Sequence, residues 1–267
     1  MHKEFNTMNE QEQMEFFYDI LDASLPRLGP GDDVSTRKAL STIIDTRSES
    51  CDSLDPRKLR ILDLGCGNGA QTMDLAANTE GTILALDNHK PYLQELKRRA
   101  VALGVETQIQ VCLGDMQNLE LDKGSFDVVW CEGALYIMGF NTGLDACFDL
   151  LVPGGSLAVT ELCWLRPDVP QECRAFFETG YPAMVDVETN LNEIRDCGFK
   201  LLDCFVLPES AWLESYYAPL ELRLQGFRGV YEDCPEKLEY VECVQSEIDL
   251  YRRYSSYYGY VFFVMQR

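Results

Sequence analysis

Three glycines and two acidic residues between positions 63 and 87 have the types and spacing of a nucleoside-binding turn. An apolar run ends at Asp63, Gly65, Gly67 and Gly69 follow, and Asp87 lies 20 residues after Gly67. Glycine allows the backbone to approach a ligand closely or to adopt positive φ. A carboxylate at the position of Asp87 can accept both hydroxyls of a ribose. The helix expected after the turn would direct its free N–H groups into the same crevice.

The spacing of this turn fits two kinds of cofactor. Gly65, Gly67 and Ala70 satisfy the G-x-G-x-x-(G/A) pattern of nicotinamide dinucleotide folds, with Asp87 on the ribose. The same stretch satisfies (D/E)-x-G-x-G-x-G, in which Asp63 belongs to the pattern. The turn alone therefore leaves both cofactors open.

Further segments extend the second pattern. They read Leu-Ala-Leu-Asp-Asn at 84–88, Leu-Gly-Asp-Met at 113–116, Phe-Asp-Val-Val-Trp at 126–130 and Leu-Val-Pro-Gly-Gly-Ser at 151–156. In order and interval these motifs resemble those of the class I S-adenosylmethionine-dependent methyltransferases. The resemblance covers roughly residues 58 to 165. A dinucleotide-dependent enzyme has no evident use for the Gly-Asp-Met and Pro-Gly-Gly pieces, so the resemblance favours a methyltransferase.

The resemblance implies S-adenosyl-L-methionine as methyl donor, S-adenosyl-L-homocysteine as product, and a set of binding residues. Asp63 would anchor the amino-acid end of the cofactor, directly or by ordering the turn. The backbone of the turn, Asp87 and Asn88 would hold the ribose and the adenine edge. Asp115 would take the adenine amino group and the Met116 backbone a ring nitrogen. The expected cofactor-binding residues are thus Asp63, Gly65, Cys66, Gly67, Gly69, Gln71, Asp87, Asn88, Asp115, Met116 and Cys131.

Most candidates for the acceptor side lie just past the expected carboxyl ends of strands, and Tyr18 belongs to the N-terminal helical cap. Glu132 is the candidate for a general base or for a group that orients an amine or hydroxyl. The expected acceptor pocket contains Tyr18, Tyr136, Glu161 and Trp164. Trp212, Tyr216 and Tyr217 fit either an apolar pocket wall or ordinary core. The sequence leaves open which acceptor is used and whether oxygen, nitrogen or carbon is methylated.

These residues sit in an alternation of strands and helices, which requires a mostly parallel sheet with helices on both faces. The expected fold is α/β, a Rossmann-like doubly wound sheet of seven strands, and the resemblance implies that the last strand is antiparallel. Apolar periodicity predicts strands at 59–64, 82–86, 108–113, 126–131, 156–162, 199–207 and 258–265. It predicts intervening helices at 69–77, 91–103, 143–151 and 188–197.

Helical segments flank this core. Asn9 and Glu12 form a capping signal for a first helix, and Ser35 is the expected cap of a second. Residues 208–257 separate the last two strands and contain an amphipathic helix near 238–251. The chain is expected to be a single domain, 1–267, with a helical cap at 1–57, a cofactor-binding core at 58–165 and a helical insertion or lid at 208–257.

Composition limits the setting of the protein. Of 267 residues 46% are apolar, and no run is long enough to span a membrane. The first residues lack the apolar core of a signal peptide, so we expect no leader. Eleven cysteines without a C-x-x-C pair read as reduced thiols in the cytoplasm. Only two histidines occur, His2 and His89, so no metal site is expected.

A formal net charge of −21 argues against a nucleic-acid partner, because phosphate binding needs a basic surface. The local cluster Lys97–Arg99 is expected to be a solvated helix face. The acceptor is therefore expected to be a small molecule, handled by a monomer or homodimer without nucleic-acid or membrane partners. An NAD-dependent oxidoreductase and a non-catalytic S-adenosylmethionine-binding protein are the alternatives.

Overall fold

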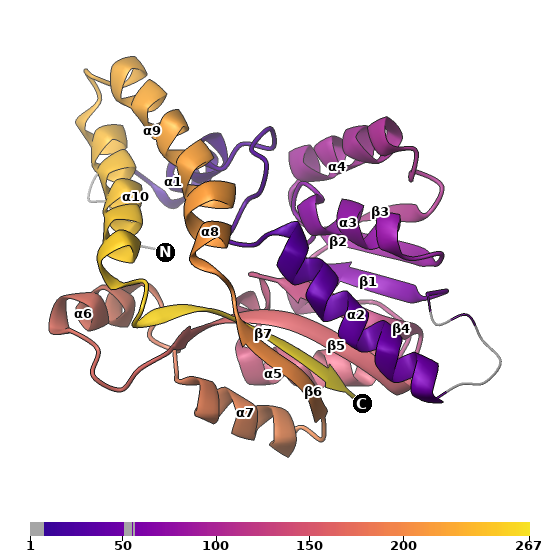
Figure 1. The fold of residues 1–267 in the computed structure, drawn as a ribbon. Helices are drawn as coiled ribbons and strands as arrows, with labels where there is room; N and C mark the ends of the chain where they lie inside the picture. Colours follow the sequence, from indigo (N-terminus) through magenta and orange to yellow (C-terminus); the bar gives the residue numbers. More distant parts are fainter. Residues whose placement is uncertain (1–7, 51–54, 56) are drawn as a thin grey trace.

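The fold is built on one seven-stranded mixed sheet (Figure 1). The structure is a computed structural model that describes residues 8–50, 55 and 57–267, so the expectations for the first residues, His2 and Cys51 lie outside it. The strands are β1 Arg60–Leu64, β2 Thr82–Asp87, β3 Ile109–Leu113, β4 Phe126–Glu132, β5 Leu151–Trp164, β6 Lys200–Val206 and β7 Tyr258–Gln266. Their order is β3-β2-β1-β4-β5-β7-β6. Strand β7 runs antiparallel to β5 and β6, whereas β1 to β5 are parallel, which confirms the expected topology.

Helices cover both faces of the sheet. One face carries α2 Asp33–Ser50, α3 Ala70–Asn78 and α4 Lys90–Leu103, and the other carries α5 Phe140–Leu150 and α7 Val187–Asp196. Side chains alternate along the strands, so Ile61 packs toward α2 and α3 while Leu62 packs toward α5. The same alternation puts Trp130 on the α2 face and Cys131 on the α5 face.

A third group of helices lies at the end of the sheet where the parallel strands finish. It contains α1 Glu10–Ile20, α6 Gln171–Gly180, α8 Glu209–Trp212, a π-turn at Leu213–Tyr217, α9 Ala218–Val230 and α10 Pro235–Tyr254. Figure 1 shows α1 beside α9 and α10, although they are far apart in the sequence. Phe16 of α1 packs against Phe227 of α9 and Tyr240 of α10. The segment between β6 and β7, residues 208–257, is called the late insertion below. It forms one aromatic-rich layer together with the N-terminal helix α1.

The structure corrects several expected boundaries. The capping box of Asn9 and Glu12 is present at α1. The cap of α2 is Asp32 rather than Ser35, because the Ser35 N–H donates to Asp32 Oδ1 at 2.6 Å and Ser35 lies inside the helix. Strand β5 begins at Leu151 rather than at 156 and runs through the Pro-Gly-Gly segment. Helices α6 and α9 were not predicted, and no described helix is both long and apolar enough to cross a bilayer.

Candidate active site

The glycine turn between β1 and α3 depends on positive φ. Gly65, Gly67 and Gly69 have φ of 67°, 54° and 83°. An added Cβ would lie 2.5 Å from Ala134 Cβ at Gly65 and 2.5 Å from Leu96 Cγ at Gly69. These glycines therefore permit close packing of the turn against the protein itself. Gly65, Cys66 and Gly67 also line a cavity, whereas Gly69 does not and serves the start of α3.

Asp63 links the glycine turn to the first residues of α3. Its carboxyl group is fully buried and accepts hydrogen bonds from Thr72 Oγ1 at 2.6 Å and from Gln71 Nε2 at 3.2 Å. Burial raises the pKa of Asp63 from its usual value to about 7. The side chain faces α3 and is absent from the residues that line the cavity. Of the two expected roles, the geometry supports ordering of the turn.

Asp87 lies at the carboxyl end of β2 with both of its oxygens oriented by backbone groups. Oδ2 accepts from Gly67 N–H at 2.9 Å, and Oδ1 accepts from His89 N–H at 2.8 Å. Burial raises the pKa of Asp87, while the His89 and Gly67 hydrogen bonds work in the opposite direction. These hydrogen bonds hold the carboxylate in place at the cavity. Such a fixed carboxylate could accept hydrogen bonds from the two hydroxyls of a diol.

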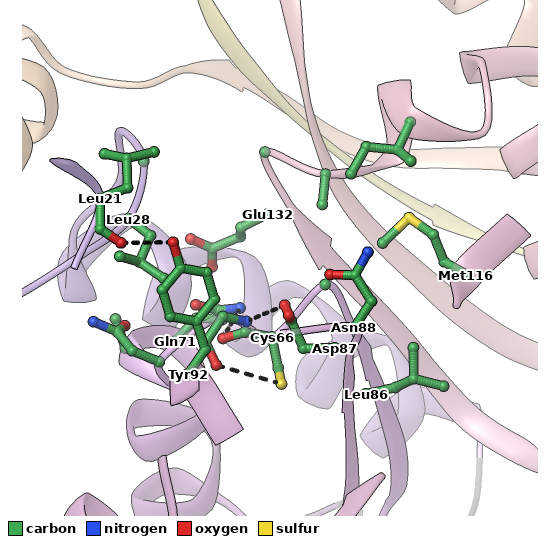
Figure 2. A pocket seen from close by; sticks show the side chains of 18 of the residues that line it. Leu21, Leu28, Cys66, Gln71, Leu86, Asp87, Asn88, Tyr92, Met116 and Glu132 are labelled. Carbon is green, nitrogen blue, oxygen red and sulfur yellow. Dashed lines mark hydrogen bonds between the residues drawn. The ribbon is translucent and has the colours of Figure 1, made fainter. Parts of the chain in front are cut away.

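The glycine-turn cavity, as we call it, has a volume of about 170 Å³ (Figure 2). Around it Figure 2 shows Asp87 and Asn88 near Cys66, with Met116 on one side and Tyr92 and Leu28 on the other. Of the expected cofactor-binding set, the structure brings eight residues to this cavity: Gly65, Cys66, Gly67, Gln71, Asp87, Asn88, Asp115 and Met116.

Cys131 does not reach the cavity and corrects the expectation. It is fully buried in the core on the α5 face, where burial raises its pKa well above the ordinary value, with a further contribution from Cys147. The strand alternation that points Trp130 and Glu132 toward α2 necessarily points Cys131 away from them.

A roof loop, residues 21–31, covers the glycine-turn cavity and is tied to the core by side chains that donate to its carbonyls. Tyr92 Oη donates to the Leu21 carbonyl at 2.6 Å, and Asn68 Nδ2 donates to that of Leu25 at 2.6 Å. Arg99 donates to the Leu25 carbonyl at 2.7 Å and to that of Pro26 at 3.0 Å. Arg99 therefore fastens the roof, which corrects the expectation that 97–99 is only a solvated face.

Glu132 is held in a closed network at the end of β4. Oε2 accepts from Arg27 of the roof at 3.2 Å, and Oε1 accepts from Thr36 Oγ1 at 2.8 Å and from Trp130 Nε1 at 2.9 Å. Glu132 also lines the glycine-turn cavity, so the network fixes the carboxylate there, and its expected role as a general base stays a prediction. Arg27 was missed at the sequence level, where it is only an isolated base between turn-forming prolines.

A second, larger cavity of about 260 Å³ adjoins the first; we call it the aromatic cavity. Its walls come from α1, the roof loop, α6 and the late insertion, and include Trp212, Tyr216 and Tyr217. The two cavities share Phe17, Leu21, Leu28, Gly29, Pro30 and Gly133 as a common wall. Trp212, Tyr216 and Tyr217 are thus both buried and part of a cavity wall.

The expected acceptor-side residues are only partly brought together. Tyr136 lines the aromatic cavity. Tyr18 instead stacks on His89 at 3.6 Å between ring centroids, and Trp164 packs edge-on against Phe177. Neither lines a described cavity. Glu161 accepts from Tyr181 Oη at 2.6 Å and lines a third hollow, which shares Leu162 and Tyr181 with the aromatic cavity. Burial raises the pKa of Glu161 to about 7.

Comparison with known proteins bears on the family. A family model described as a methyltransferase domain matches residues 61–155, which span β1 to the start of β5. This match supports the resemblance of residues 61–155 to a class I S-adenosylmethionine-dependent methyltransferase domain. A sterol 24-C-methyltransferase of Kluyveromyces lactis is 26% identical over 170 residues, 60% of this chain and 45% of that protein. The chain thus matches about half the length of this methyltransferase.

One further relative and one solved structure cover more of the chain. The 27-O-demethylrifamycin SV methyltransferase of Amycolatopsis mediterranei is 25% identical over 200 residues, 72% of this chain and 70% of that protein. A crystal structure of a methyltransferase from Geobacter sulfurreducens with S-adenosylhomocysteine has a TM-score of 0.76 at 20% identity, over 94% of this chain and 98% of that one. That methyltransferase shares the fold.

Proposed function

We propose that this protein transfers a methyl group from S-adenosylmethionine to a small-molecule acceptor. The observation that carries the proposal is the Asp87 carboxylate, which two backbone N–H groups orient at the glycine-turn cavity. A fixed acidic acceptor at the end of the second strand suits a ribose diol. The family match disfavours the dinucleotide alternative.

The residues of the glycine-turn cavity fit this cofactor. Asp115 and Met116 stand where an adenine edge would be read, and Leu86 and Ile137 offer apolar contacts for its ring. Gln71 and the backbone of the turn would bind the amino-acid end of the cofactor. Asp63 would contribute indirectly, because it holds Gln71 by a hydrogen bond. When bound, S-adenosylmethionine supplies an activated methyl group on a sulfonium.

The chain's own contribution is alignment and exclusion of water. The six residues of the common wall carry no titratable side chain, so they position the reactants and keep the boundary between the cavities dry. The roof loop and the late insertion form the outer walls. We propose that 1–57, 58–165 and 208–257 work as one domain, with the last segment as the acceptor lid.

The net charge of −21 supports an acceptor without a phosphate chain and no nucleic-acid partner. The ten described cysteines are free thiols, which supports a reducing, cytoplasmic setting.

Transfer of a labelled methyl group from S-adenosylmethionine to a metabolite extract tests the activity. A labelled small molecule that is absent with Asp87→Ala is the expected result. Cofactor binding without transfer to any metabolite would instead indicate a non-catalytic S-adenosylmethionine-binding protein. A protein named as the cyclase SpnF has the same fold, with a TM-score of 0.72 at 19% identity over 97% of this chain and 96% of that one, so the fold alone does not decide between these two outcomes.

A further inference from the structure

Aromatic side chains form much of the lining of the aromatic cavity and pack against one another. The indole of Trp212 stacks between the ring of Tyr251, 4.3 Å away, and that of Tyr260, 5.3 Å away. Tyr216 and Tyr217 pack on each other with centroids 5.1 Å apart. Such contacts fix the rings before any ligand arrives. The negative faces of tyrosine rings attract cations, including quaternary ammonium groups.

Glu247 of α10 is the one charged residue among those that line the aromatic cavity. The Tyr217 hydroxyl donates to it at 3.0 Å, and no basic side chain in the described part of the chain forms an ion pair with it. Burial raises the pKa of Glu247, and the hydrogen bond from Tyr217 works in the opposite direction. A ligand cation beside this carboxylate would stabilise its ionised form.

Two polar atoms of the same wall have no hydrogen-bond partner. Trp212 Nε1 and Tyr258 Oη are both buried and unpaired within the described structure, and the two side chains are 3% and 1% exposed. Leaving such groups unpaired costs free energy, so their presence in a native structure indicates a partner that binds there. Both are donors, and a ligand oxygen would satisfy them.

We propose that the aromatic cavity binds the acceptor as an organic ammonium ion, with Glu247 as counter-ion and an oxygen of the same molecule accepting from Trp212 and Tyr258. The inference rests on the proposed function, since it identifies the substrate class of the same enzyme. Glu247, Trp212 and Tyr258 lie outside the common wall. They therefore recognise the acceptor, while another part of it faces the methyl donor.

Three benzyl probes of matched shape separate the charge from the oxygen. The first is benzyl(2-hydroxyethyl)dimethylammonium, which carries both features. The second is its neutral carbon isostere, 3,3-dimethyl-4-phenylbutan-1-ol, which keeps only the oxygen. The third is benzyldimethylpropylammonium, which keeps only the charge. Each is titrated by calorimetry into the full chain, with and without S-adenosylhomocysteine.

The first probe is expected to bind wild-type protein about tenfold or more tightly than the neutral isostere. Glu247→Gln should remove that advantage and leave the isostere's affinity unchanged. Trp212→Phe should weaken the two hydroxyl-bearing probes and spare the propyl probe. Unchanged S-adenosylhomocysteine affinity in both variants shows that their fold is intact.

Equal affinity of the cation and its isostere for wild-type protein would overturn the inference, and this comparison needs no variant. Failure of both cations to bind would overturn it as well. A wild-type protein that does not bind S-adenosylhomocysteine would instead count against the proposed function. The probe titrations without that ligand keep the two failures distinct.

Discussion

The Arg27 guanidinium lies 3.2 Å from the Glu132 carboxylate, and both side chains are buried. The contact spans 105 residues of sequence and joins the roof loop to the end of β4. Thr36 and Trp130 complete the set of donors to Glu132. A buried ion pair therefore holds the roof loop to the end of β4, and both of its residues line the glycine-turn cavity.

Arg27→Met should lower the free energy of unfolding by about 3–5 kcal/mol, because it leaves the Glu132 carboxylate buried without a cation. Glu132→Gln should also destabilise, and the double variant should lose less than the sum of the two. Urea denaturation measures all three. The exposed pair Arg166–Asp168 provides the control, since solvent screens this pair and Arg166→Met should change the stability far less than Arg27→Met. Strictly additive losses at Arg27 and Glu132 would refute the coupling.

Gly67→Ala should weaken S-adenosylhomocysteine binding more than its cost in stability explains. Its φ is +54°, and a new Cβ would lie 3.0 Å from Leu28 Cδ1 in the common wall. Gly104→Ala is the matched control, because Gly104 has φ of +69° at the end of α4 with open space around a Cβ. Both changes should cost about 1–2 kcal/mol of stability. Calorimetry should find reduced affinity only at position 67, and equal affinity in both variants would contradict this account.

Asp63→Asn should flatten the pH dependence of stability. The carboxyl pKa is 3.8 ordinarily and about 7 in the fold, so between these values the native state holds a proton that the unfolded chain has lost. The native state then binds more protons, and the free energy of unfolding falls as pH rises through this window. The variant should remove up to about 1.4 kcal/mol per pH unit of that fall.

Glu161→Gln provides the comparison for Asp63, because its pKa is raised from 4.5 to about 7 and acts with the same sign. Each variant should remove its own share of the slope in denaturation series run at several pH values. A wild-type slope retained by Asp63→Asn would show that Asp63 is ionised throughout.

S-adenosylhomocysteine should slow hydrogen exchange in the roof and in the late insertion as well as in the core. The roof contacts the core through Tyr92 and Asn68, and Arg223 of α9 donates to the Asp19 carbonyl at 2.9 Å. Binding at the glycine-turn cavity should therefore stabilise both the roof loop and the late insertion. We expect protection at 14–40 and 208–235 in addition to 60–135. Protection confined to 60–135 would leave the lid role without support.

The sequence predicted that the glycine turn and Asp87 lie together, because the signals for them are local. The turn glycines and Asp87 sit at strand ends that apolar periodicity locates, and parallel strands bring those ends together. The cap of α2 was misplaced because Asp32 and Ser35 are both good capping residues. Cys131 was misjudged because one step along β4 reverses the face of the sheet.

The acceptor side could not be predicted in the same way. Trp212, Glu247 and Tyr258 come from three separate elements and meet only through packing of the late helices. Helix α9 was missed because its glycines and Pro219 weaken the local helical signal. It is defined instead by tertiary contacts such as that of Phe16 with Phe227. The roof contacts of Arg27 and Arg99 are equally nonlocal.

Calorimetric titration of S-adenosylhomocysteine into wild-type protein and Asp87→Ala tests the central claim most directly. Loss of a charge-assisted bond to a ribose diol should cost about 1.5–3 kcal/mol, or roughly ten- to hundredfold in affinity. Asp149→Ala, which removes an equal charge from an exposed site that lines neither cavity, should bind as wild type does. The account predicts binding by wild type in the micromolar range, about 8 kcal/mol, and the selective loss at Asp87. A folded wild-type protein that does not bind this ligand, or an Asp87→Ala variant that binds it unchanged, would contradict the account.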